Sequence, residues 1–381
     1  MIYLDNAATS YPKPPSVIEA MTKCMNEYCA NPGRGGHNLS VLSSKAIMDA
    51  RTAICDFFNV GSPMQVCFTK NATEALNIAI KGIIKTGSHV ITSSMEHNSV
   101  IRPLKALEKE GIIEISIVKG DEYGRINHLD ISKNIKKNTD LIVLTLSSNV
   151  NGMIMPVKEV GEIAASFGIP FLLDASQGAG VIKIDMKEMQ ISMLAVPGHK
   201  SLYGPQGTGC LCVDEKIKLK PLMQGGTGSN SKNTYQPEIM PDLAESGTLN
   251  TPGIVGLHSG IEFIKSQGID TISYNKNLLV KKLIEGLSEF KKIKIYSSSD
   301  IKYNSGIVAF NIEDMDSTEV SYLLDNNYDI AVRAGFHCSP VAHMTIGTAE
   351  SGAVRLSPGY FNTLDEIDFT LEAIRKIIYK S

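Results

Sequence analysis

The sequence predicts an α/β fold in which helices cover both faces of a mostly parallel sheet. The first observation behind this prediction is that short apolar runs alternate with amphipathic stretches through the middle of the chain. The second is size: 381 residues, 43% of them hydrophobic and 20% charged, are typical of a globular protein with a large core and two domains. Strands that alternate with helices are joined by crossover connections, which place neighbouring strands parallel.

Hydrophobic periodicity and the residues that end each run give the individual elements. Short apolar runs predict strands at 89–94, 114–120, 140–148, 169–176, 191–196 and 209–214. Helical spacing predicts helices over 98–111, with Pro103 in its first turns, and over 157–168, which ends at Gly168. Beyond about residue 255 a long amphipathic segment and shorter elements follow, so we expect a domain boundary there.

Charge and cysteine content exclude several classes of protein. The formal net charge is −3 and no block of like charges occurs, which argues against nucleic acid or an anionic membrane as the main partner. The first residues lack the pattern of a signal peptide, and no apolar run reaches the ~18 residues of a membrane span. Seven irregularly spaced cysteines predict no disulfide framework, so we expect a cytoplasmic protein.

Polar residues directly after predicted strands are candidates for a site, because open α/β sheets bind ligands at the carboxyl ends of their strands. These residues are Asn149, Asp174, Gln177, His199 and Lys200. A lysine held at a strand end beside apolar walls loses solvation and becomes reactive, although a solvated turn lysine is the alternative. Asp174 suits a protonated pyridine nitrogen, as in pyridoxal phosphate, or else caps the next turn.

Two further segments pass from a strand into a helix. Asn71 and Thr73 lie where "FTKNATEALNIAI" (68–80) changes to helical spacing, which suits either a phosphate site or a plain N-cap. His97 follows the strand at 89–94, where an imidazole could stack on a planar ring or be structural. Both segments therefore leave a functional and a structural interpretation open.

The segment "VRAGFHCSPVA" (331–341) brings Arg333, His337 and Cys338 together in a small turn. The cysteine there could be a buried core residue, a metal ligand, a disulfide partner or a nucleophile. Among the other cysteines, Cys210 and Cys212 alternate along one strand and therefore share a face. Because the chain has no second pair of cysteines at a suitable spacing, we do not expect a metal site there. The remaining cysteines are two expected core residues, Cys55 and Cys67, and two that the sequence leaves undecided, Cys24 and Cys29.

Taken in order, these segments resemble the cysteine desulfurases, which are fold-type I pyridoxal phosphate enzymes of the class V aminotransferase group. The similarity covers nearly the whole chain and rests on YLDNAATS, GRGGHNLS, NATEALN, MEHNSV, SNVNG, DASQ, GHKSLYGPQGTG, ESGTLNTPGI, RAGFHC and VRLSPGYFNTLDEID. The compact RAGFHC form is similar to the branch with selenocysteine lyases and SUF-pathway desulfurases. The resemblance implies a seven-stranded sheet in a large domain (15–255) and a smaller α+β domain (1–14 and 256–381).

For the cofactor ring, the resemblance implies that Lys200 binds pyridoxal 5'-phosphate covalently and that Asp174 pairs with its pyridine nitrogen. Gln177 would bond the ring hydroxyl, His97 would stack on the ring, and Asn149 would lie near cofactor and substrate.

For the phosphate, the resemblance implies Ala72, Thr73 and His199, with Thr248 reaching across from the second subunit of a homodimer. One departure concerns Pro197, which stands where relatives usually carry a serine that donates to the phosphate.

For the substrate, the resemblance implies that Arg355 clamps the carboxylate of L-cysteine or L-selenocysteine as a bidentate donor. Asn149 would also contact the substrate, and Arg333, Arg34 and His37 would line the entrance.

The implied reaction uses Lys200 as the base that removes the Cα proton, with His97 beside the ring. Cys338 attacks the substrate sulfur as a thiolate, helped by positive charge from Arg333 or a protonated His337. Alanine and a persulfide for a sulfur-acceptor protein result. Rival interpretations are a selenocysteine lyase, a cysteine-sulfinate desulfinase, an aminotransferase with a structural Cys338, or a delivery module that is slow without its acceptor. The segment from Cys338 to Arg355, which includes His343, is longer than this branch leads us to expect.

Overall fold

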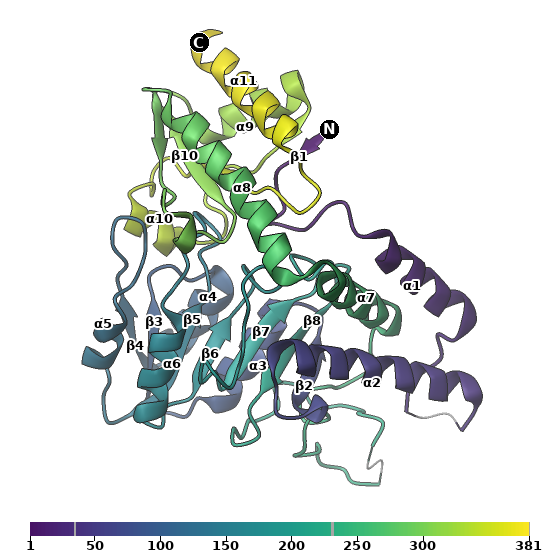
Figure 1. Ribbon diagram of the computed structural model, residues 1–381. Helices are drawn as coiled ribbons and strands as arrows, with labels where there is room; N and C mark the ends of the chain where they lie inside the picture. Colours follow the sequence, from purple (N-terminus) through teal and green to yellow (C-terminus); the bar gives the residue numbers. More distant parts are fainter. Residues whose placement is uncertain (34–35, 230–231, 381) are drawn as a thin grey trace.

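The structure is a computed structural model that describes residues 1–33, 36–229 and 232–380. Figure 1 shows a large sheet with its helices and, above it, a smaller group of helices and strands where both termini lie. Helix α8 (Ile269–Ser288) rises from the large layer into the smaller one.

The large sheet has seven strands, as expected. Their bounds are β2 Val66–Thr69, β3 Ser88–Ser93, β4 Ile113–Val118, β5 Thr139–Thr145, β6 Phe171–Asp174, β7 Met193–Pro197 and β8 Gly209–Val213. They lie in the order β2-β8-β7-β6-β5-β3-β4, and β8 alone runs antiparallel to its two neighbours. The prediction of a mostly parallel sheet is confirmed, and each predicted strand lies in it within a few residues.

Helices cover both faces of this sheet because each strand is apolar on both sides. On one face, Phe171 and Leu194 pack with helices α2, α6 and α7; on the other, Leu172 and Met193 pack with α3 and α4. The helices are α1 Pro15–Glu27, α2 Asn38–Phe58, α3 Ala72–Ile83, α4 Asn98–Lys109, α5 His128–Lys133, α6 Val157–Ser166 and α7 Thr251–Gln267. Such two-sided burial explains the near-continuous apolar runs in the sequence.

The smaller part is built on an antiparallel sheet in the order β12-β10-β9. Its remaining elements are β9 Ile293–Ile295, β10 Val308–Ile312, β12 Val354–Leu356, α9 Ser317–Tyr328, α10 Pro340–Ile346 and α11 Leu364–Lys380. Strand β1 (Ile2–Tyr3) pairs with β11 (Ile330–Ala331), so the first residues join this part. Helix α7 packs on α1 and α2 of the large part, and the domain boundary near residue 255 stays a prediction.

Two short 3-10 turns complete the described elements, at Pro63–Gln65 and Ile301–Tyr303. Within the described residues, no helix is both long and apolar enough to cross a membrane. All seven cysteines are free thiols: Cys55 and Cys67 are core residues, as expected, and Cys210 and Cys212 share one face of β8. Cys24 is buried, whereas Cys29 and Cys338 are exposed.

Candidate active site

A cavity of about 230 Å³ lies where the carboxyl ends of the parallel strands face the loop at 333–338. It collects most of the residues that the sequence singled out. Its lining includes Ala72, Thr73, His97, Asn149, Asp174, Gln177, Pro197, His199, Lys200, Arg333, His337, Cys338 and Arg355. The structure therefore brings polar residues that follow separate strands together in one cavity.

Lys200 and Asp174 form the electrostatic centre of the cavity. Asp174 ends β6 and is 2% exposed, and its Oδ1 accepts the backbone N–H of Ser176 at 2.9 Å. Burial lowers the pKa of Lys200 to about 8; Asp174 opposes this shift, and Arg355 and Arg333 add to it. A lysine with this pKa is partly deprotonated near neutral pH, so it can act as a nucleophile or a base.

His97 is the N-cap of α4 and faces the cavity as a neutral imidazole. Its Nδ1 accepts the backbone N–H of Ser99 at 3.0 Å. Burial and the nearby Lys200 charge lower the pKa of His97 to about 4. Because an amide can only donate, Nδ1 is the acceptor, and the proton of the ring is therefore on Nε2.

One end of the cavity lies between the first turns of α3 and α4. Thr73 Oγ1 and Ser99 Oγ are 2.8 Å apart there, and both residues line the cavity. His199 also lines the cavity, and its buried Nδ1 has no hydrogen-bond partner. Burial, helped by Lys200 and Lys13, lowers the pKa of His199 to about 4, so the ring is neutral.

The loop at 333–338 covers the cavity and holds Cys338 in an unusual backbone conformation. His337 and Cys338 have φ values of 47° and 59°, which lie in the left-handed region that residues other than glycine rarely adopt. Contacts from the large part hold both carbonyls: Asn149 Nδ2 donates to His337 O at 2.6 Å, and Asn98 N donates to Cys338 O at 2.8 Å. The exposed thiol of Cys338 thus stands on a loop that the rest of the protein constrains.

Arg355 lies on β12, opposite Arg333, and its side chain is already engaged. Its Nη2 donates to Asp5 Oδ1 and its Nη1 to the carbonyl of Asn149, each at 2.8 Å. Its Nε is buried without a partner. A bidentate clamp on a substrate carboxylate, as the sequence predicts, therefore requires Arg355 to exchange or share the contact with Asp5.

The suggestion that a protonated His337 supports the Cys338 thiolate is wrong. His337 is 4% exposed, and its Nε2 donates to the carbonyl of Ala353 at 3.0 Å. Burial, with the positive charge of Arg355, lowers the pKa of His337 to about 2, so the ring is neutral. Arg333, which lines the same cavity, is the remaining source of positive charge that the sequence predicted for the thiol.

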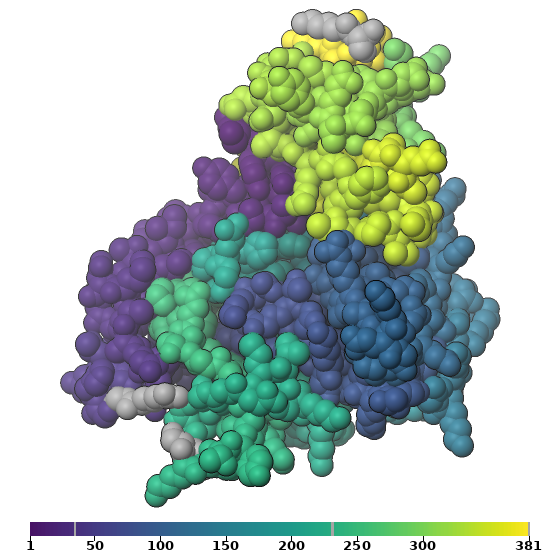
Figure 2. Space-filling view, turned by 180° about the vertical axis from the view of Figure 1, so that it is seen from behind, coloured from purple at the N-terminus to yellow at the C-terminus, as the bar shows by residue number. Residues whose placement is uncertain are grey.

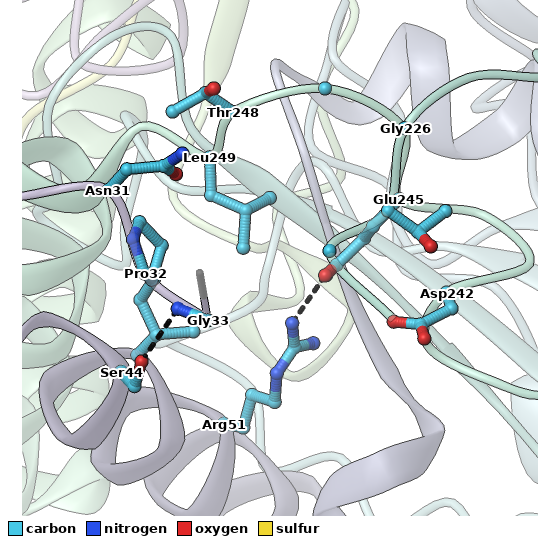
Figure 3. A pocket seen from close by; sticks show the side chains of 14 residues that line it. Asn31, Pro32, Gly33, Ser44, Arg51, Gly226, Asp242, Glu245, Thr248 and Leu249 are labelled. Carbon is cyan, nitrogen blue, oxygen red and sulfur yellow. Dashed lines mark hydrogen bonds and ion pairs between the residues drawn. The ribbon is translucent and has the colours of Figure 1, made fainter. Parts of the chain in front are cut away.

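Two predicted residues lie away from this cavity in the described chain. His37 is exposed at the start of α2, where its Nδ1 caps the helix by accepting from Ser40 N at 3.3 Å. Thr248 lines a second pocket of about 330 Å³, beside Asn31 and next to the buried Arg51–Glu245 ion pair (Figure 3). Figure 2 shows the N-terminal segment, in purple, near the teal segment before α7 on this side of the molecule. The predicted entrance residue Arg34 lies outside the described residues.

Comparison with known proteins agrees with the geometry. The aminotransferase class-V pattern matches residues 2–369, nearly the whole chain. This chain is a member of the aminotransferase class-V family. Similar members include probable cysteine desulfurases of Methanothermobacter thermautotrophicus, 35% identical over 99% of this chain and 94% of the relative, and of Pyrococcus abyssi, 33% identical over 99% and 94%. The apo structure of a cysteine desulfurase from Thermococcus onnurineus NA1 is 32% identical, with a TM-score of 0.94 over 100% of this chain and 95% of that one.

Members of this class V family depend on pyridoxal 5'-phosphate, and the cavity fits that cofactor. Lys200 and Asp174 supply an amine for its aldehyde and a buried carboxylate for its pyridine nitrogen. The unpartnered Nδ1 of His199, the open hydroxyl of Thr73 and the first amides of α3 supply donors for its phosphate. Among the described residues, no three or more His, Cys, Asp and Glu side chains are arranged to hold a metal ion.

The residues that sequence reasoning missed at this class V site include Ser99 and Asp5. Ser99 lies in the cavity next to Thr73, although only its position two residues after His97 could have indicated this. Asp5 forms the ion pair with Arg355 across 350 positions of sequence. No periodicity predicts such a pair, because it depends on β1 pairing with β11 and on the bridge from Asp5 to Ser357, just after β12.

Proposed function

We propose that this chain is a pyridoxal phosphate-dependent cysteine desulfurase, which converts L-cysteine to L-alanine and keeps the sulfur as a persulfide on Cys338. The observation that carries the proposal is the exposed Cys338 thiol on the rim of the cavity that also contains Lys200 and Asp174. The names of similar family members point in the same direction. A plain aminotransferase has no use for a thiol at this position.

The residues of the cavity divide the work of proton transfer. Bound pyridoxal phosphate withdraws electrons from the substrate Cα, which makes the Cα proton acidic and the Cβ–S bond easier to break. Asp174 keeps a proton on the pyridine nitrogen by offering a buried negative charge. Lys200, with its pKa near 8, accepts the Cα proton at Nζ.

Neutral side chains would hold the cofactor ring. His97 would stack on it, and Gln177 has one N–H left for the ring hydroxyl after donating to Ala7 O at 2.8 Å. Both residues are held by backbone contacts at 3.0 Å or less, so they are positioned before a ligand enters.

Arg355 binds the substrate carboxylate in this proposal. Its contact with Asp5 holds the guanidinium in place before substrate arrives, and the substrate carboxylate then takes over or shares the donors. Asn149 contacts both groups: its backbone carbonyl accepts from Arg355, and its side-chain amide donates to the carbonyl of His337 in the Cys338 loop. Substrate anchoring and loop position are thereby connected through one residue.

Cys338 removes the sulfur. Its Sγ forms a bond to the substrate sulfur while the substrate Cβ–S bond breaks, and the carbon skeleton takes a proton to become alanine. Overall, L-cysteine and the Cys338 thiol give L-alanine and the Cys338 persulfide, so atoms and electrons balance without an external oxidant. The positive charge of Arg333 in the same cavity favours the attacking thiolate.

The proposal also includes a homodimer, a sulfur-acceptor protein and a cytoplasmic location. In a dimer, the exposed Thr248 would reach the phosphate of the other subunit, and the exposed His37 would lie at an entrance. An acceptor must collect the sulfur from Cys338, and an exposed thiol on the rim allows this. Seven free cysteines suit a reducing compartment.

The test compares Cys338→Ser and Cys338→Ala with Cys29→Ser, which alters the other exposed thiol. We expect the two Cys338 variants to lose alanine formation from L-cysteine and the persulfide detected by mass spectrometry, while their cofactor absorbance and melting temperature stay unchanged. Cys29→Ser keeps full activity. Undiminished alanine and sulfide release by Cys338→Ala would overturn the proposal, and loss with cysteine but full activity with L-selenocysteine would identify a selenocysteine lyase.

A further inference from the structure

The first turns of α3 and α4 bring two hydroxyl groups together at one end of the cavity. Thr73 and Ser99 each occupy the second position of their helix, and their hydroxyl oxygens lie 2.8 Å apart. Both residues line the cavity and neither is buried, so a ligand can reach both oxygens. The first amides of α3 add N–H groups, whereas those of α4 already donate to Cys338 O and to His97 Nδ1, so α4 adds only the positive end of its helix dipole.

Pro197, the last residue of β7, offers the cavity no donor. It lines the cavity, but proline has neither a hydroxyl nor a backbone N–H. Ala72, at the start of α3, also lacks a polar side chain. The lining side chains that can donate include Thr73, Ser99 and His199, whose Nδ1 has no partner.

The hydroxyl of Ser99 is free to change its partner. Its Oγ lies 2.9 Å from His97 Nδ1, but this nitrogen already accepts the backbone N–H of Ser99 at 3.0 Å. The single lone pair of His97 Nδ1 is shared between the hydroxyl and the backbone N–H of Ser99. If the hydroxyl proton turns toward an anion, His97 Nδ1 still accepts the backbone N–H. Thr73 Oγ1 can keep its contact with Ser99 Oγ or turn its own proton toward the anion.

We propose that Ser99 is a phosphate-binding residue of the cofactor site and supplies the hydroxyl donor that Pro197 does not. This inference rests on the pyridoxal phosphate of the proposed function, and it adds a residue that the sequence resemblance does not assign. The ligand chemistry is that of a phosphate monoester dianion at two converging helix starts. Ser99 also fixes the tautomer of His97 through its backbone N–H. That role concerns the cofactor ring, so a ligand without the phosphate distinguishes it from phosphate binding.

The experiment measures the dissociation constants of pyridoxal phosphate and of pyridoxal, which lacks the phosphate, for the cofactor-free protein by equilibrium dialysis. We expect Ser99→Ala to weaken pyridoxal phosphate binding about tenfold, the size expected for one hydrogen bond to a charged group, and to leave pyridoxal binding unchanged. Ser99→Thr keeps the hydroxyl and binds as the unaltered protein does. Restoring a hydroxyl at the end of β7, in Ser99→Ala with Pro197→Ser, recovers the lost affinity.

Thr318→Ala is the matched control. Thr318 is the second residue of α9, its N–H donates to the N-cap Asp316 at 2.7 Å, and it lies far from the cavity, so it reports the cost of losing a hydroxyl at a helix start. Equal affinity of Ser99→Ala and unaltered protein for pyridoxal phosphate would overturn the inference. An equal loss with both ligands would assign Ser99 to the ring alone and overturn it as well. If the unaltered protein failed to bind pyridoxal phosphate, the proposed function itself would fall.

Discussion

The two walls of the active-site cavity are built in different ways. The wall with Asp174, His199 and Lys200 follows the ends of β6 and β7, so paired strands in the core of the large sheet fix its backbone. The wall with His337 and Cys338 is a loop in a strained conformation, held by hydrogen bonds from Asn149 and Asn98. One wall is part of the regular fold, and the other depends on a few tertiary contacts.

This difference matches what each wall has to do in the proposed reaction. A proton-transfer group and a cofactor ring need a fixed geometry, which buried parallel strands supply. A sulfur carrier needs a position over the substrate and later access to an acceptor outside the cavity. A loop held by few contacts can supply both, because breaking those contacts costs little compared with disrupting a strand.

The largest effect is expected for Lys200→Ala, which removes the reactive group of the strand-end wall. General base catalysis alone contributes about 10²- to 10⁴-fold, and the covalent anchor of the cofactor is lost as well. We therefore expect turnover to fall at least that far, together with the visible absorbance of the covalently bound cofactor. Absorbance spectroscopy and alanine formation measure the two effects.

A second buried lysine provides the control for Lys200. Burial lowers the pKa of Lys276 to about 8 as well, but this residue packs against Gly306 and does not line the cavity. Lys276→Ala should keep the cofactor absorbance. This result would show that the cofactor needs a lysine in the cavity, and not merely a buried lysine with a lowered pKa. Persistence of the covalent absorbance in Lys200→Ala would contradict the assignment.

A smaller effect is expected for Ser339→Ala, which weakens the loop wall. Ser339 is completely buried, and its Oγ donates to Asn149 Oδ1 at 2.7 Å. Losing this bond should open the loop about fivefold more often, since a buried hydrogen bond contributes roughly 1 kcal/mol. We expect faster hydrogen exchange at residues 333–339 and a turnover lowered by about fivefold at most, with unchanged cofactor absorbance.

Ser93→Ala is the matching change at the end of β3, in the same sheet that carries the strand-end wall. Ser93 is also completely buried, and its Oγ donates to Glu96 Oε1 at 2.6 Å. This variant should lower the melting temperature without changing hydrogen exchange in the loop. If both serine variants changed loop exchange equally, the loop wall would not be held separately from the sheet.

The sequence predicted the strand-end wall more completely than the loop wall. Asp174, His199 and Lys200 directly follow apolar runs, and the edge of a parallel sheet brings such residues together whatever the details of packing. His337 showed the limit: its charge depends on burial by β12 and on the nearby Arg355, which no local pattern contains. The ion pair of Asp5 and Arg355 could not be predicted either, because it joins residues from the two ends of the chain.

The smallest effect concerns His343, which packs beneath the loop wall on α10. It is completely buried, with its ring centroid 5.4 Å from that of Phe336 and 5.6 Å from that of His337, and its Nδ1 is 2.7 Å from Thr348 Oγ1. Burial lowers the pKa of His343 to about 4, against the opposing effect of the nearby Phe336 and Thr348 carbonyls. The folded protein therefore excludes a proton that the unfolded chain binds below its ordinary pKa of 6.5.

The sign of the pH dependence follows from this exclusion. Between pH 6.5 and 4 the unfolded state holds more protons at this residue, so His343 makes the protein lose stability as the pH falls through that window. His343→Phe should lose about 1 kcal/mol at pH 7.5, where the contact with Thr348 is missing. The free energy of unfolding of this variant should then fall less steeply on acidification, by up to about 1.4 kcal/mol per pH unit.

Urea unfolding at pH 7.5, 6 and 5 measures the loss of stability and its pH dependence, with His128→Phe at a partly exposed position as the control. Parallel pH profiles for His343→Phe and the unaltered protein would mean that His343 is protonated in the folded state, and that the loop wall has a charge beneath it.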